Sequence, residues 1–135
     1  MLADKSALAR LGRSEVGARL RPLIEAGRLA ACSIVLLEVL FSARSPGDYR
    51  DTRRRISLAL ELVPMNQAVL DRAVDVQALL AQRSRHRGVS LPELMIAATA
   101  EQHDLIVLHY DVDFDRIAQV SGQRTEWVVG RGTVP

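Results

Sequence analysis

Short continuous apolar runs alternate along the chain with segments of helical spacing. The apolar runs at 29–33 and 105–109 are typical of buried strands, and shorter strands are expected at 1–4, 62–63 and 126–129. Apolar residues three and four positions apart predict helices at 14–26, 35–43, 67–82, 92–103 and 114–120. Ser6 is expected to cap a short helix that reaches Leu11, and 48–60 has an arginine-rich polar side with Ile56 and Leu60 turned inward. Loops are expected at 45–47 and 84–90.

Strands that alternate with helices predict a parallel sheet covered by helices on both faces. The 135 residues fit one compact domain over 1–135, with a single modest core. Ligands of such sheets lie beyond the carboxyl ends of the strands. The residues that follow each predicted strand are therefore the first candidates for chemistry.

Composition narrows the function classes only slightly. The chain is 48% apolar and 25% charged, which is ordinary for a globular protein, and its 4% of aromatic residues argues against base stacking as the main nucleic-acid contact. Lys5 is the only lysine, and the other basic side chains are arginines, which bind carboxylates and phosphates well. A GC-rich genome would also favour arginine over lysine. Cys32 is the only cysteine, so no internal disulfide can form. With no apolar stretch long enough for a bilayer and no signal-peptide pattern, we expect a cytoplasmic location and no membrane partner.

Acidic residues recur at or shortly after junctions between predicted elements, where the fold would bring them to one edge of the sheet. Carboxylates crowded at one sheet edge raise one another's pKa, and a divalent cation removes this repulsion. Oxygen ligands of this kind favour Mg²⁺ or Mn²⁺, and such a site suits phosphodiester hydrolysis by a metal-activated water. The acids in question are Asp4, Glu38, Glu93, Asp111 and Asp113.

Each of these acids also has a simpler explanation. Asp4 could belong to a mobile terminus, and Glu38, within an otherwise apolar helix, could form a structural salt bridge with an arginine. Glu93 suits the first turn of a helix through the helix dipole. Asp111 and Asp113 could form a solvated turn that caps a helix. An EF-hand is excluded, because the loop positions that need glycine and glutamate hold other residues.

Four segments, in this order, resemble PIN-domain ribonucleases of the VapC type, the toxins of bacterial toxin–antitoxin pairs. They are DKSAL at 4–8, LLEVL at 36–40, LPELMIAA at 91–98 and LHYDVDF at 108–114, and the tail TEWVV at 125–129 is similar to mycobacterial members. The resemblance implies an α/β protein with a three-layer α/β/α fold and a mainly parallel five-stranded sheet. It also implies a homodimer, Mg²⁺-dependent cleavage of RNA with Mn²⁺ as a substitute, and inhibition by a cognate VapB-type antitoxin.

The resemblance further implies roles for individual residues. The five acids form the catalytic set, with Asp4, Glu93 and Asp111 as metal ligands. Ser6 matches a hydroxyl that hydrogen-bonds within the pocket. Arg53 and Arg85 come from two arginine-rich segments that could hold the RNA backbone, although such segments are more often solvated faces.

Two departures from the family pattern leave alternatives open. Glu93 stands where the family usually has aspartate, and the extra methylene moves a carboxylate by about an ångström and a half, enough to disturb an octahedral Mg²⁺ site. Lys5 replaces a common threonine. A PIN-like binding module with weakened chemistry is therefore one alternative. Another is an Asp-x-Asp phosphatase with Asp111 as nucleophile, although few residues follow that motif.

Overall fold

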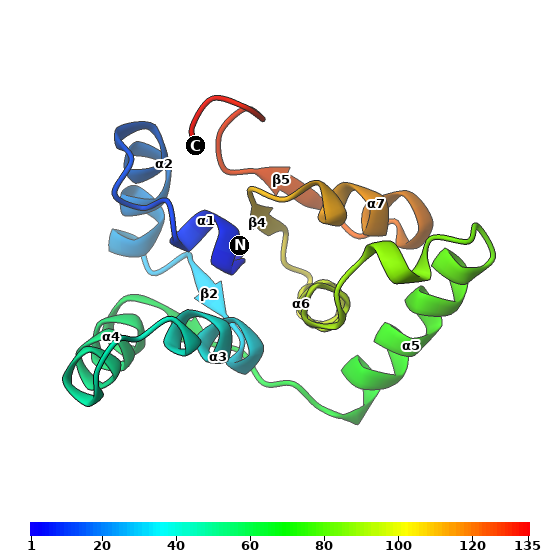
Figure 1. Cartoon of the computed structure of the whole chain (residues 1–135), viewed down its shortest axis with the longest axis horizontal. Coiled ribbons are helices and arrows are strands. Elements are labelled where there is room, and N and C mark those ends of the chain that lie inside the picture. Colours follow the sequence, from blue (N-terminus) through cyan, green and yellow to red (C-terminus); the bar gives the residue numbers. More distant parts are fainter.

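The computed structural model describes residues 1–135 and contains a five-stranded sheet between two groups of helices (Figure 1). The strands are β1 (Leu2–Ala3), β2 (Ala30–Ala31), β3 (Glu61–Leu62), β4 (Val107–His109) and β5 (Thr125–Trp127). The helices are α1 (Lys5–Leu8), α2 (Ser14–Glu25), α3 (Ser33–Phe41), α4 (Pro46–Ala59), α5 (Gln67–Ala81), α6 (Leu91–Gln102) and α7 (Val112–Ser121), with a 3₁₀ turn at His86–Gly88. No helix combines the length and the apolar character needed to cross a membrane.

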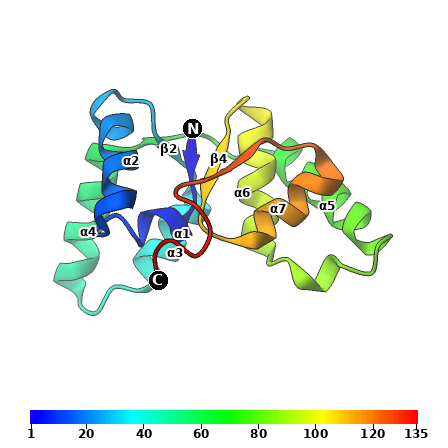
Figure 2. The same cartoon turned by 90° about the horizontal axis from the view of Figure 1, so that it is seen from above.

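The sheet has the strand order β3-β2-β1-β4-β5, and every neighbouring pair is parallel. Figure 2 shows α2 and α4 on one side of the strands and α5, α6 and α7 on the other. The three-layer α/β/α fold with a parallel sheet is therefore confirmed. Because β1 lies at the centre of the sheet beside β4, the segments that follow these two strands emerge at the same edge.

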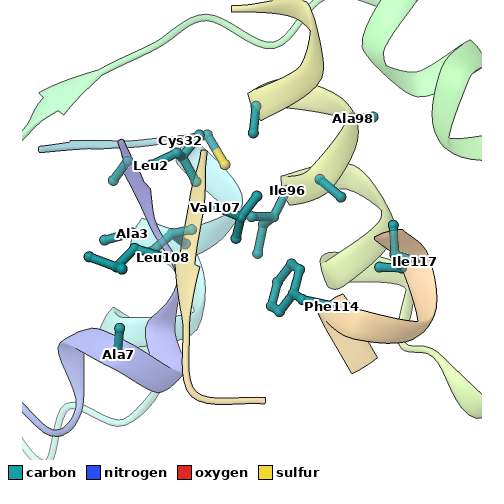
Figure 3. Packing of buried hydrophobic residues seen from close by; sticks show 14 of the residues in the cluster. Leu2, Ala3, Ala7, Cys32, Ile96, Ala98, Val107, Leu108, Phe114 and Ile117 are labelled. Atoms are coloured by element: carbon teal, nitrogen blue, oxygen red, sulfur yellow. The ribbon is translucent and has the colours of Figure 1, made fainter. Parts of the chain in front are cut away.

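The central strands are apolar on both faces because helices cover both. Leu2 of β1 and Leu108 of β4 are fully buried. Figure 3 shows Ile96 of α6 and Phe114 of α7 on one side of these strands and Ala7 of α1 on the other. This packed layer holds the ends of β1 and β4 rigidly, which matters for the residues that follow them.

Several helix starts differ from those expected from the sequence. Asp4, not Ser6, caps α1, and its Oδ2 accepts the Ser6 amide hydrogen at 2.8 Å. The loop expected at 45–47 is wrong for its last two positions, because Ser45 caps α4 and Pro46 occupies the first turn, where its fixed φ is compatible with a helix. Asp111 caps α7, which begins at Val112. In each case a side-chain acceptor satisfies an unpaired helix amide, a local bond that apolar periodicity does not reveal.

Candidate metal centre

The predicted acids converge on one edge of the sheet from different elements. Asp4 directly follows β1, and Asp111 lies two residues after β4, the neighbour of β1 in the sheet. Glu93 stands in the first turn of α6, and Asp113 stands in the first turn of α7. Two of these four acids are helix caps, and the other two lie in first turns, so helix N-termini face this region from several directions.

Glu93, Asp111 and Asp113 form the tightest acidic group. One carboxylate oxygen from each lies within 4.8 Å of the others, and all three side chains are half-buried. The extra methylene of Glu93 therefore does not carry its carboxylate away from the group. Of the three ligands expected from the family, Glu93 and Asp111 are in this group, and Asp113 is its third member; the role of Asp4 as a ligand stays a prediction.

The environment of Glu93 favours its neutral form. Burial raises the pKa of Glu93 to about 8, and a hydrogen bond to Asp111 and repulsion from Asp111 and Asp113 act in the same direction. The Ser90 amide opposes this effect by donating to the Glu93 carboxylate. Without a cation, the group therefore holds a proton between Glu93 and Asp111 at neutral pH, which a bound divalent ion would replace.

Backbone hydrogen bonds orient two of these carboxylates. The Ser90 amide donates to Glu93 Oε2 at 3.0 Å and the Glu93 amide donates to Ser90 Oγ at 3.4 Å, which forms a capping box at the start of α6. Asp111 Oδ1 accepts the Asp113 amide hydrogen at 3.0 Å. Neither side chain can rotate away without losing a cap worth about 1 kcal/mol. One oxygen of each carboxylate is thus fixed, and the other is available to a cation once the shared proton leaves.

Asp4 and Glu38 form a second acidic pair. Asp4 is only 4% exposed, and its Oδ2 accepts the Ser6 amide at 2.8 Å and the Ser6 hydroxyl at 2.5 Å. Burial raises the pKa of Glu38, and the negative charge of Asp4 adds to this effect, whereas Lys5 lowers it. Ser6 Oγ in turn accepts the Tyr110 amide hydrogen at 2.9 Å, which ties Asp4 to the chain just before Asp111. The Asp4 carboxylate thus caps α1 and is bonded to Ser6, and it is not one of the three carboxylates of the tight group.

The residues fit a hard divalent cation. The centre offers only carboxylate oxygens, which are the ligands that Mg²⁺ and Mn²⁺ prefer. Few protein cations balance the five acids: Arg116 pairs with Asp113, and Lys5 acts on Glu38. Glu38 forms no salt bridge with an arginine, which removes the structural explanation of this acid. The unbalanced negative charge is what a bound metal would neutralise.

Arg53 and Arg85 do not belong to the acidic centre. Arg53 is exposed on α4, Arg85 is exposed just before the 3₁₀ turn, and neither forms an ion pair. Their contact with RNA stays a prediction. Contact of Ser6 with substrate also stays a prediction, and the Ser6 hydroxyl already donates to Asp4 and accepts from the Tyr110 amide.

The sequence analysis did not predict the hydrogen bonds between Glu93 and Ser90, although the pattern Ser-x-x-Glu is a known capping signal.

His109, next to the site in sequence, is fully buried. Its ring lies 5.1 Å from the ring of Phe114 and 5.1 Å from that of Trp127. Burial lowers the pKa of His109, although Asp115 and the acids of the site oppose this shift. A substrate cannot reach this side chain, so its effect on the site must pass through its neighbours.

Comparisons with known proteins agree with the fold. A family model described as PIN domain matches residues 1–120. Ribonuclease VapC21 from Mycobacterium tuberculosis is 46% identical over 132 residues, which cover 98% of this chain and 96% of the relative. A toxin–antitoxin complex from Klebsiella pneumoniae has a TM-score of 0.68 at 26% identity and covers 95% of this chain and 97% of its own. The VapBC2 complex from Rickettsia felis, bound to a DNA fragment from its promoter, has the same fold. Its TM-score is 0.77 at 13% identity, and the match covers 93% of this chain and 96% of the matched chain.

Proposed function

Because this chain belongs to the PIN domain family, among its VapC ribonucleases, we propose that it is the toxin of a type II toxin–antitoxin pair and hydrolyses RNA in the cytoplasm with Mg²⁺ at its acidic centre. One observation carries the metal assignment: three half-buried carboxylates within 4.8 Å of one another, with no cation in the protein sufficient to balance them. The name of VapC21 supports RNA as the substrate.

Glu93, Asp111 and Asp113 would hold the metal, and Asp4 and Glu38 would act on it through bound water. When bound, Mg²⁺ supplies a water of lowered pKa and neutralises the charge that develops on the phosphate, and Mn²⁺ has the same ligand preference. No protein side chain is required as a nucleophile. This is why the carboxylates alone account for the chemistry.

The other residues of the centre keep these carboxylates in place. Ser90 holds Glu93 through the capping box, so the carboxylate does not have to be ordered when the cation binds. Ser6 holds Asp4 against the end of β4. Lys5, the only lysine of the chain, lies beside Glu38 and could contact an RNA phosphate.

The test compares the wild type with Asp111→Asn, which removes one ligand charge and keeps the side-chain size. Mn²⁺ binding is measured by calorimetry, and RNA cleavage by sequencing new RNA ends after incubation with Mg²⁺. Asp75→Asn is the matched control, because Asp75 is exposed on α5 away from the site. We expect cleavage and Mn²⁺ binding in the wild type and the control, and their loss in Asp111→Asn. A wild type that binds no Mn²⁺ at millimolar concentration contradicts the proposal.

The antitoxin partner fits an apolar groove next to this centre. The groove has a volume of about 410 Å³ and lies between α1, α2, α3 and α4. Its apolar lining would take the apolar face of an amphipathic segment, and Lys5 and Arg55, which also line it, would meet acidic residues of that segment. Lys5 directly follows Asp4, so a VapB-type antitoxin seated here would reach the acidic centre. The apolar residues include Leu8, Leu11, Ile24, Val39 and Ile56.

The groove is tested by filling it. Ala9 lines it and is exposed, so Ala9→Trp adds bulk without removing core contacts. We expect this change to weaken antitoxin binding and to leave Mn²⁺ binding unchanged. Ala26→Trp, at the exposed end of α2, is the control. Equal antitoxin affinity in both variants would place the partner elsewhere.

A second copy of the chain would cover exposed apolar side chains on α3, α5 and α6. Phe41 and Leu37 on α3 are 90% and 60% exposed, and Val74 on α5 and Leu91 on α6 are 64% and 61% exposed. Large apolar side chains exposed to this degree are typical of a surface that a partner covers. The homodimer that the family resemblance implies would bury them.

A further inference from the structure

The His109 ring contains the one buried side-chain nitrogen or oxygen of this structure that has no hydrogen-bond partner. That atom is Nε2, and the ring around it is fully buried. Buried polar atoms are normally paired, so an unpaired one calls for a physical explanation. The neighbours of His109 are aromatic rings on two sides and the acid Asp115.

The other ring nitrogen determines which tautomer is present. Asp111 donates its amide hydrogen to His109 Nδ1 at 3.2 Å. A nitrogen that accepts a hydrogen bond carries no hydrogen itself, so in the neutral ring the hydrogen must be on Nε2. The unpaired atom is therefore a donor, and a carboxylate is the group that best satisfies it.

Asp115 provides that carboxylate. His109 Nε2 lies 3.9 Å from Asp115 Oδ1, which is too long for a hydrogen bond. The Nε2–H dipole of the neutral ring is still attracted by the charge of this partly exposed carboxylate. Trp127 Nε1 donates to both oxygens of Asp115, at 3.2 and 3.1 Å, and so keeps the carboxylate facing the ring. The His109 ring thus lies between the Asp115 carboxylate in the body of α7 and the amide of Asp111, the residue that caps this helix, and is hydrogen-bonded only to the amide.

We propose that His109 is a positioning residue of the metal centre: its Nε2–H tautomer, oriented by Asp115, accepts the Asp111 amide hydrogen and fixes the turn that presents Asp111 and Asp113. The assignment to a metal centre depends on the proposed function. Mg²⁺ demands near-octahedral geometry, so a small displacement of this turn weakens binding. Hydrogen bonds that orient metal-binding side chains in this way are typically worth about 10–100-fold in metal affinity.

The tautomer can be measured without any substitution in the active centre. The chain has three histidines, so ¹⁵N labelling of histidine and comparison with His86→Gln and His103→Gln assign the His109 ring. Long-range ¹H–¹⁵N spectra of the full-length protein then show which ring nitrogen carries the hydrogen. We expect hydrogen on Nε2 and none on Nδ1. The opposite tautomer overturns the proposal.

Two variants separate positioning from packing. His109→Asn keeps an acceptor oxygen near the position of Nδ1, whereas His109→Leu keeps the bulk and has no acceptor. We expect His109→Leu to lose about 10–100-fold in Mn²⁺ affinity and His109→Asn to keep most of it. Phe114→Leu, in the same ring cluster, is the packing control and should keep its Mn²⁺ affinity despite lower stability. Equal Mn²⁺ affinity in all three variants contradicts a positioning role.

Hydrogen exchange of the Asp111 amide separates this proposal from the metal assignment. In metal-free protein we expect this amide to be protected in the wild type and in His109→Asn, and to exchange faster in His109→Leu. A wild type that fails to bind Mn²⁺ but shows this pattern refutes the metal centre while retaining the positioning of the turn. A wild type whose Asp111 amide exchanges freely refutes the positioning itself.

Discussion

Replacing Glu93 by glutamine should stabilise the metal-free protein at alkaline pH while abolishing metal binding. Glutamine is neutral at all pH values and nearly isosteric with the protonated acid. It also supports a capping box at this position, so the bonds to Ser90 are expected to persist. The substitution therefore removes the ionisation of Glu93 with little change to the helix start.

The magnitude follows from the raised pKa. A carboxyl with a pKa of about 8 in the folded protein and 4.5 in the unfolded chain binds more protons when folded across this interval. Stability is therefore full below the unfolded pKa and falls as pH rises towards 8. If the whole pKa shift acted on folding, the free energy of unfolding would fall by about 5 kcal/mol between these pH values. Solvent screening of the partly exposed group reduces the expected loss to about 2 kcal/mol.

Urea denaturation of metal-free protein tests this reasoning. We expect wild type and Glu93→Gln to have similar stability near pH 5 and the variant to be more stable by about 2 kcal/mol near pH 9. Glu25→Gln, at the exposed end of α2, is the control and should show no such divergence. A stability difference that stays constant between these pH values would mean that Glu93 ionises normally and that the centre has no excess negative charge.

Three further outcomes are expected. Arg116→Gln should raise Mn²⁺ affinity several-fold in calorimetry, because the cation that pairs with Asp113 is removed; unchanged or lower affinity would show that Arg116 does not compete with metal. Ser6→Ala should lower the free energy of unfolding in urea by about 1–3 kcal/mol, because buried Asp4 loses a hydroxyl donor. A loss near zero would mean that water replaces the hydroxyl. Phe41→Ser should shift a dimer towards monomer in sedimentation without lowering monomer stability, as Phe41 is 90% exposed, and an unaffected dimer would exclude α3 from the interface.

Local sequence patterns were sufficient to predict most of the fold. The apolar runs around Ala30 and Val107 predicted buried parallel strands, which the structure has as β2 and β4. Where local reasoning failed, at Asp4 and Pro46, a capping bond outweighed the apolar spacing. Helix starts depend on single hydrogen bonds, which periodicity does not report.

The acids of the centre and their common sheet edge were predictable from the sequence, but the distances between their carboxylates were not. The order of strands in the sheet brings the end of β1 beside the end of β4, and the packing of α6 adds Glu93 to Asp111 and Asp113. Asp4, which we expect to be a metal ligand, caps α1, and its carboxylate is not among the three of the tight group.

Residue identity and spacing thus establish the α/β class, the helices and the set of candidate acids, because side-chain periodicity and the residues after strands depend on short stretches of chain. Distances between carboxylates, the raised pKa of Glu93 and the contact of the His109 ring with Trp127 arise only when segments far apart in the chain are packed together. Burial and charge repulsion depend on all neighbours at once, and no single stretch of sequence contains those neighbours.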